Sequence, residues 1–72
     1  MKINIVIPCY NEQEVLHKTI DVLGKLADKI KRETGVDTML LLVDDGSKDN
    51  TWKMIEEAGQ VHSFISGIKL SH

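Results

Sequence analysis

The spacing of apolar residues divides the chain into three apolar stretches separated by two segments of helical periodicity. Residues 2–8, KINIVIP, are rich in β-branched side chains and alternate three isoleucines with other residues, which predicts a strand ending at Pro8. Residues 38–44, TMLLLVD, form an apolar run without alternation, a pattern typical of a parallel strand covered on both faces. Residues 63–70, SFISGIKL, predict a third strand.

The first helical segment covers residues 11–35. Its apolar residues recur at helical spacing and would lie on one face of a helix; they are Leu16, Ile20, Leu23, Ala27 and Ile30. Asn11 followed by Glu14 resembles a capping box, which would place the helix start at Asn11. Gly35 is a typical residue for the helix end.

A second, shorter helix is predicted over residues 50–59, capped by Asp49 or Asn50 and ending near Gly59. The order strand, helix, strand, helix, strand indicates an α/β fold with a three-stranded parallel sheet. This is the first half of a Rossmann-like nucleotide-binding sheet. Because no repeat, low-complexity tract or linker divides the chain, we expect residues 1–72 to form a single partial domain.

The composition of the chain argues against several classes of function. The 72 residues are 42% hydrophobic and 28% charged with a formal net charge of -2, so no basic excess points to nucleic acid. Cys9 is the only cysteine, which excludes an internal disulfide and fits a reducing, cytoplasmic compartment. The longest apolar run, residues 39–43, is far shorter than the roughly 20 residues that a membrane-spanning helix needs.

Two polar clusters follow the first and second predicted strands: PCYNEQE, residues 8–14, and DDGSKDNT, residues 44–51. Ligands of such sheets bind outside the carboxyl ends of the strands, so the clusters should be neighbours in space. Asp44 or Asp45 would accept hydrogen bonds from a base N–H or from ribose hydroxyls. Tyr10 would pack against a base, and Gly46 would let the backbone approach the ligand closely.

Other interpretations of the same residues stay open at this point. Asp45, Gly46 and Ser47 also suit a tight turn, and Asp49 suits a helix cap. An acidic pair at a strand end can also hold Mg²⁺, as in a receiver-like α/β domain. A non-catalytic interaction module is a further alternative. Titrations with metal and with nucleotide would distinguish a receiver-like domain, an interaction module and a nucleotide-binding domain.

The two clusters together resemble the first two signatures of family 2 glycosyltransferases of the GT-A fold. The similar segments are IVIPCYNEQEVL and LLLVDDGSKDNTWKMIEE, and the likeness extends over residues 2–71. It is strongest to dolichol-phosphate mannose synthase and to bacterial polyprenyl-phosphate glycosyltransferases. The resemblance implies the amino-terminal, nucleotide-sugar-binding part of an enzyme that moves a hexose from a UDP- or GDP-sugar to an acceptor, a polyprenyl phosphate. It also implies that the full-length enzyme works at the cytoplasmic face of a membrane.

The resemblance assigns roles to residues of both clusters. Residues of the first cluster would line the nucleoside pocket, and Asp45, together with Asp44, would bind the base. The complete set of predicted nucleotide-binding residues is Pro8, Tyr10, Asn11, Glu12, Asp44, Asp45, Gly46 and Ser47.

Two features of that family are missing from these residues: the Asp-x-Asp metal motif and the catalytic base carboxylate. After Asp49 the only acidic residues are Glu56 and Glu57, which are adjacent on the predicted helix and therefore point in different directions. Mg²⁺ or Mn²⁺ is accordingly expected for the full-length enzyme but not for these 72 residues, which we expect to be inactive alone.

The predicted topology also suggests self-association. The resemblance implies the strand order 3-2-1, and right-handed crossovers would then place both helices on one face of the sheet. The opposite apolar face and the edge of the first strand would stay uncovered, and both features promote association. We expect the isolated chain to dimerise through this face or through the first strand, or else to be partly molten.

Overall fold

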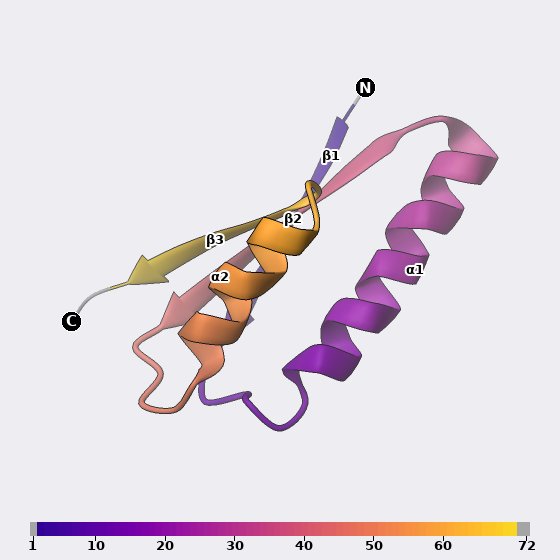
Figure 1. Ribbon diagram of the computed structural model, residues 1–72. Helices are drawn as coiled ribbons and strands as arrows, with labels where there is room; N and C mark the ends of the chain where they lie inside the picture. The colour runs from indigo at the N-terminus through magenta and orange to yellow at the C-terminus, as the bar shows by residue number, and fades with distance from the viewer. Residues whose placement is uncertain (1, 71–72) are drawn as a thin grey trace.

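The computed structural model describes residues 2–70 and contains three strands and two helices in the predicted order (Figure 1). The strands are β1 (Lys2–Cys9), β2 (Asp37–Asp45) and β3 (Ile65–Leu70), and the helices are α1 (Leu16–Thr34) and α2 (Thr51–Val61). All strand pairs are parallel, and β2 lies between β1 and β3. The predicted three-stranded parallel sheet is therefore confirmed.

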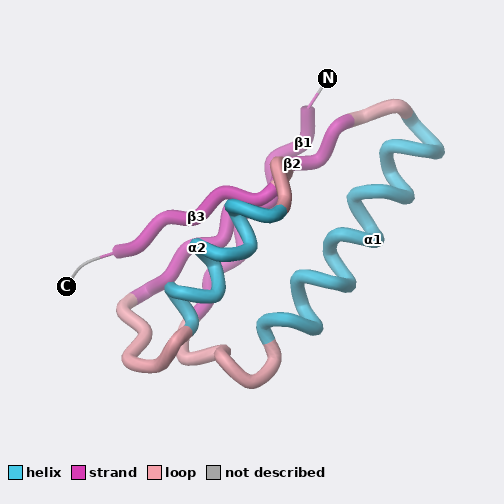
Figure 2. Tube along the Cα trace, in the orientation of Figure 1, coloured by secondary structure: helices cyan, strands magenta, loops and turns pink. Residues whose placement is uncertain are grey.

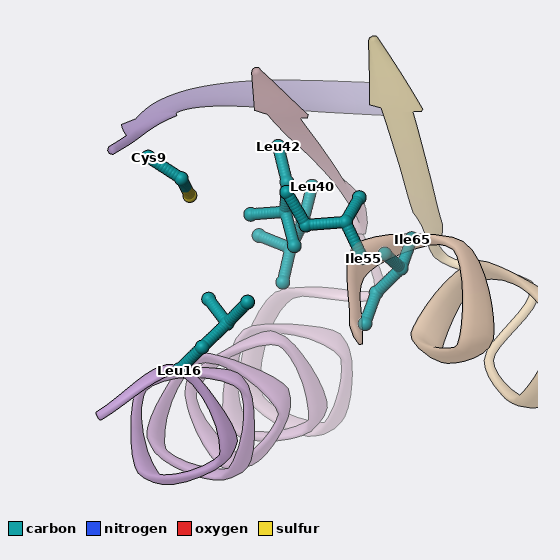
Figure 3. Close-up of a cluster of buried hydrophobic side chains, with 6 residues drawn as sticks. All are labelled: Cys9, Leu16, Leu40, Leu42, Ile55 and Ile65. Carbon is teal, nitrogen blue, oxygen red and sulfur yellow. The ribbon is translucent and has the colours of Figure 1, made fainter. Parts of the chain in front are cut away.

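Both helices pack on the same face of the sheet, as right-handed crossovers in one direction require (Figure 3). The side chains of β2 alternate: Leu40 and Leu42 are buried toward the helices, whereas Leu41 and Val43 on the other face are only half-buried. The prediction that β2 is covered on both faces is wrong for this structure, because no helix lies on the second face.

The hydrophobic core lies between the sheet and the two helices. Its buried members are Cys9, Leu16, Leu40, Leu42, Ile55 and Ile65, which come from all five elements (Figure 3). Burial of a large aliphatic side chain contributes roughly 1.5–3 kcal/mol, so these contacts hold each helix against the sheet. Trp52 on α2 packs against the same cluster and is partly buried, as expected for a core residue.

The first helix begins later than predicted. Its N-cap residue is Val15, which has no side-chain cap, so the capping box predicted for Asn11 and Glu14 does not form. Asn11 has a left-handed backbone with φ of 48°, and its side chain accepts a hydrogen bond from Lys48 N–H instead. A helix cap residue keeps a negative φ, so the chain makes a separate turn before α1 starts.

The two predicted helix ends have different outcomes. Gly35 ends α1 with φ of 74° and donates its N–H to the Lys31 carbonyl at 2.8 Å, as predicted. Gly59 does not end α2, which continues to Val61. A Cβ at Gly59 would lie 3.4 Å from the Ile65 carbonyl oxygen, so this glycine lets the helix approach the start of β3 rather than stopping it.

The strand β3 approaches α2 so closely at Gly67 that a side chain has no room there. A Cβ on Gly67 would lie 2.5 Å from Ile55 Cγ2 and 3.2 Å from Trp52 Cζ3. We therefore expect Gly67→Ala to lower the free energy of unfolding by roughly 1–3 kcal/mol, because overpacking displaces α2 or strains its side chains. Urea unfolding followed by circular dichroism measures the change.

Ser66→Ala is the matched control, because Ser66 precedes Gly67 on β3 and is exposed. It should change the free energy of unfolding by less than about 0.5 kcal/mol. Equal stability of the Gly67→Ala protein and the wild type would contradict the close packing of α2 on β3.

Candidate functional site

The two polar clusters meet at the carboxyl end of the sheet, as predicted. The loop after β1 and the loop after β2 lie at the same end of the molecule (Figure 2). Cys9 and Asp44, the last paired residues of these strands, are register partners. Because neighbouring strands lie about 4.8 Å apart, the residues that follow this pair are side by side.

Hydrogen bonds between the loops hold them together. Backbone N–H groups of each loop donate to side chains of the other, and we call this set the cross-loop network. The five bonds are Asn11 N–H to Ser47 Oγ at 2.8 Å, Glu12 N–H to Thr51 Oγ1 at 2.9 Å, Gln13 N–H to Asp49 Oδ2 at 3.3 Å, Lys48 N–H to Asn11 Oδ1 at 2.8 Å and Asn50 N–H to Gln13 Oε1 at 3.0 Å. These bonds satisfy backbone donors that precede the helices and lack partners within them.

The acidic pair after β2 separates into two environments. Asp44 is 0% exposed, and its Oδ1 accepts the Ser47 N–H at 3.0 Å. Its Oδ2 is also buried and has no hydrogen-bond partner among the described residues. Asp45 is exposed, because consecutive side chains of a strand point to opposite faces of the sheet. The two carboxylates therefore do not converge on one ligand.

Tyr10 is the exposed aromatic residue beside Asp45. Its exposed fraction is 55%, and it follows directly after the Cys9–Asp44 register pair, as Asp45 does on β2. Pro8, two residues earlier on β1, is also exposed. This end of the sheet thus presents an aromatic ring just after β1 and a carboxylate at the end of the adjacent strand β2.

The remaining predicted site residues are Asn11, Glu12, Gly46 and Ser47, and the backbone or side chains of three of them belong to the cross-loop network. The Glu12 carbonyl also accepts the Val15 and Leu16 N–H groups at 3.0 and 2.9 Å. Gly46 has φ of 77°, a conformation that glycine adopts without steric cost, and it turns the chain directly after Asp45.

Cys9 is a buried, unreactive thiol. Burial raises the pKa of Cys9 to about 11, and the negative charges of Glu12 and Asp44 act in the same direction. A thiol with such a pKa stays protonated at neutral pH and is a poor nucleophile. Its role is therefore to fill space in the core, where it packs with the other buried apolar residues.

Thr51 and Gln13 are members of the cross-loop network to which no sequence pattern assigned a role. The Thr51 side chain is 0% exposed, and its hydroxyl oxygen accepts the Glu12 N–H while its hydroxyl hydrogen is donated to Asp49. A signal was present: a threonine after Asp49 suits a capped helix start. Its partner 39 positions away was not visible in any local pattern.

No metal site or membrane span is found in the part of the chain that the structure describes. Among residues 2–70, no group of three or more His, Cys, Asp or Glu residues could hold a metal ion. Within the same residues, neither helix has the length and apolarity to cross a membrane.

Comparison with known proteins gives a consistent result. The family model described as "Glycosyl transferase family 2" matches residues 4–72. The chain is 38% identical over 71 residues to "Uncharacterized glycosyltransferase YkoT" of Bacillus subtilis, which covers 96% of this chain and 21% of that protein. It is 42% identical over 60 residues to "Undecaprenyl-phosphate 4-deoxy-4-formamido-L-arabinose transferase" of Proteus mirabilis, covering 83% of this chain and 17% of that protein. The chain thus spans about a fifth of the length of these relatives. No solved structure matches it.

The cross-loop network should respond to acid through Asp49. The hydrogen bond from the Thr51 hydroxyl holds the pKa of Asp49 below its usual 3.8, and the N–H groups of Thr51 and Gln13 act in the same direction. A carboxyl whose folded pKa is lowered stabilises the fold above its unfolded pKa, and this stabilisation is lost as pH falls through the folded pKa. Carboxyl ¹³C NMR should give an Asp49 midpoint below 3.8, and the Gln13 amide should shift with it.

Thr51→Val removes the hydroxyl donor and should raise the Asp49 midpoint toward the usual value. Thr34→Val is the matched control, because the Thr34 hydroxyl donates to the Ile30 carbonyl at the other end of α1. An Asp49 midpoint at 3.8 or above in the wild type would show that these hydrogen bonds do not form in solution.

Proposed function

Because the chain belongs to glycosyltransferase family 2, we propose that it is the nucleotide-sugar-binding part of an enzyme that transfers a hexose from a UDP- or GDP-sugar. One observation carries this proposal: exposed Tyr10, the first residue after β1, and exposed Asp45, the last residue of β2, both directly follow the Cys9–Asp44 register pair at the carboxyl end of a parallel sheet. This is where α/β sheets bind nucleotides. The family membership favours this function over a receiver-like domain or an interaction module.

In the proposed complex the base lies against Tyr10. Stacking of a base on an aromatic ring contributes roughly 1–3 kcal/mol and tolerates different bases. The Asp45 carboxylate accepts a hydrogen bond from a base N–H or a ribose hydroxyl. Pro8 provides an apolar wall on the same face of β1, and Gly46 leaves space for the ribose beside Asp45.

The metal expected for the family does not fit the described residues. A chelated Mg²⁺ or Mn²⁺ needs several oxygen ligands directed at one point. Asp44 is buried and bonded to Ser47 N–H, while Asp45 is exposed on the other face of the sheet. We propose that residues 2–70 bind the nucleoside without a metal and that sugar transfer needs groups from other parts of the enzyme.

For the acceptor we propose a polyprenyl phosphate. The relative from Proteus mirabilis is named "Undecaprenyl-phosphate 4-deoxy-4-formamido-L-arabinose transferase", and the chain is 42% identical to it over 60 residues. A nucleotide-sugar donor and a lipid phosphate acceptor would meet at the cytoplasmic face of a membrane, which is the location we propose for the full-length enzyme.

The nucleotide site can be tested by NMR. UDP or GDP should shift the amide signals of Tyr10, Asp45 and their neighbours. The dissociation constant should be in the millimolar range, because no group of three or more His, Cys, Asp or Glu among residues 2–70 could hold a metal for the diphosphate. Asp45→Ala should abolish the shifts, since it removes the acceptor for the base or ribose. Asp45 is exposed, so its loss should change the free energy of unfolding by less than about 0.5 kcal/mol.

The matched control is Asp21→Ala, which removes an exposed carboxylate that pairs with Lys25 on α1. This variant should bind nucleotide like the wild type. Unchanged amide shifts at millimolar nucleotide, in a sample shown to be folded, would falsify the proposal.

We also propose that copies of this chain associate through the face of the sheet that the helices do not cover. The apolar residues placed on this face by strand alternation and register are Val6, Pro8, Met39, Leu41, Val43, Ile68 and Leu70. Val6 is 61% exposed, and Ile68 and Leu70 are also exposed. Strands spaced about 4.8 Å apart and at most nine residues long give a footprint of roughly 400 Å². This is about half the area per partner of a standard interface, so the dimer should be weak.

Sedimentation equilibrium should show a dimer at high micromolar concentration. Val6→Glu should shift the equilibrium to monomer, because a charge on the apolar face would have to be desolvated in the dimer. The control is Lys25→Glu on the solvent side of α1, where Lys25 lies 3.2 Å from Asp21. A wild-type monomer at all concentrations, without binding of a hydrophobic dye, would exclude this association.

A further inference from the structure

Asn11 on the first loop makes two hydrogen bonds with Ser47 and Lys48 on the second loop, and we call these two bonds the Asn11–Ser47 pair. The Asn11 N–H donates to Ser47 Oγ at 2.8 Å, and the Asn11 Oδ1 accepts the Lys48 N–H at 2.8 Å. The two bonds therefore engage the side-chain oxygens of both residues within the protein. A nucleotide donor directed at either oxygen would compete with these backbone N–H groups.

The backbone of Asn11 depends on this pair. Among the described residues, Asn11 is the only non-glycine residue with a positive φ, at 48°. Asparagine and aspartate adopt this region more readily than other side chains. The conformation turns the chain immediately after Tyr10, and the bond from Lys48 N–H fixes the Asn11 side chain in place.

Tyr10 and Asp45 each lie between two fixed residues. Tyr10 is exposed, but Cys9 before it is 1% exposed and Asn11 after it is bonded to the second loop. Asp45 follows the buried Asp44, and the loop after Asp45 returns to Asp44 through the Ser47 N–H. Within the cross-loop network, the Asn11–Ser47 pair is thus the connection nearest in sequence to both exposed residues.

We infer that Asn11 and Ser47 are positioning residues of the site: they set the separation of Tyr10 and Asp45 and do not themselves contact the nucleotide. This inference rests on the proposed function for its ligand. Its structural part concerns Tyr10 alone and can be tested without any nucleotide.

The side chain at position 11 can be varied to distinguish positioning of Tyr10 from direct contact with the nucleotide. Asn11→Asp keeps an acceptor for Lys48 N–H and tolerates a positive φ, so it should preserve the pair. Asn11→Gly keeps only the backbone conformation, and Asn11→Ala keeps neither. A residue whose amide nitrogen donated to a diphosphate would behave differently, because the aspartate would repel the ligand.

The readout is ¹⁹F NMR of protein labelled with 3-fluorotyrosine, which gives one signal because Tyr10 is the only tyrosine. Without nucleotide, the wild type and Asn11→Asp should share a sharp signal, whereas Asn11→Ala should broaden it or move it toward the unfolded position. With UDP or GDP, Asn11→Asp should bind within about threefold of wild type and Asn11→Ala about tenfold more weakly, as expected for a lost hydrogen bond. Asn11→Gly should lie between them.

Ser47→Ala provides a second variant, which removes the acceptor for Asn11 N–H and should move the Tyr10 signal in the same way. Asn11→Ala removes the acceptor for Lys48 N–H, and Ser47→Ala removes the acceptor for Asn11 N–H. If the two bonds act as a unit, the change in the double variant should be smaller than the sum of the two single changes. Circular dichroism verifies that each variant is folded.

The outcomes separate the inference from the proposed function. If nucleotide moves no signal of the wild type, the proposed function fails. The ¹⁹F signals recorded without nucleotide still show whether Asn11 and Ser47 position Tyr10. An unchanged Tyr10 signal in folded Asn11→Ala and Ser47→Ala would overturn the inference, as would Asn11→Asp binding as weakly as Asn11→Ala. Global unfolding of both alanine variants would also overturn it, because the pair would then stabilise the whole domain.

Discussion

The parallel pairing of β2 with both neighbours is the constraint on which the rest of the structure depends. Its register with β1 places Cys9 beside Asp44, and its register with β3 places Leu40 beside Ile65. The first pairing brings the two polar loops to one end of the sheet. The second pairing aligns the apolar residues that face the helices, so that α1 and α2 share one core. Because both crossovers turn the same way, this arrangement also leaves the other face of the sheet uncovered.

Strands and helices could be predicted where the local spacing of apolar residues determines them. Their boundaries could not be predicted where a contact with another segment determines them. The alternation in β1 and the helical spacing from Leu16 onward identified both elements within a few residues. The start of α1 was misplaced because Asn11 and Glu14 match a capping box, while the Asn11 side chain bonds to Lys48, 37 positions away. The end of α2 was misplaced because Gly59 serves a close approach to Ile65. Neither partner is visible in the local sequence.

The same reasoning applies to the candidate site. The sequence placed the right segments at the right end of the sheet, because strand order alone determines which loops meet. It did not separate residues that are exposed at the end of the sheet from residues that bind the other loop, since asparagine, serine and aspartate occur in both environments. Backbone N–H groups before a helix need acceptors, and in this structure Ser47, Asp49 and Thr51 supply them to the loop after β1. A polar motif of this kind is therefore expected even in the absence of a ligand.

The adjacent carboxylates after β2 follow from the alternation of a strand. A strand that ends with one side chain turned inward must turn the next one outward. The inward Asp44 accepts the Ser47 N–H and so shapes the turn, and it has no exposed surface for a ligand. The outward Asp45 is exposed at the position where the sheet ends and a ligand can approach. Two identical residues thus take different roles because of their parity on the strand, and the buried one fixes the loop from which the exposed one projects.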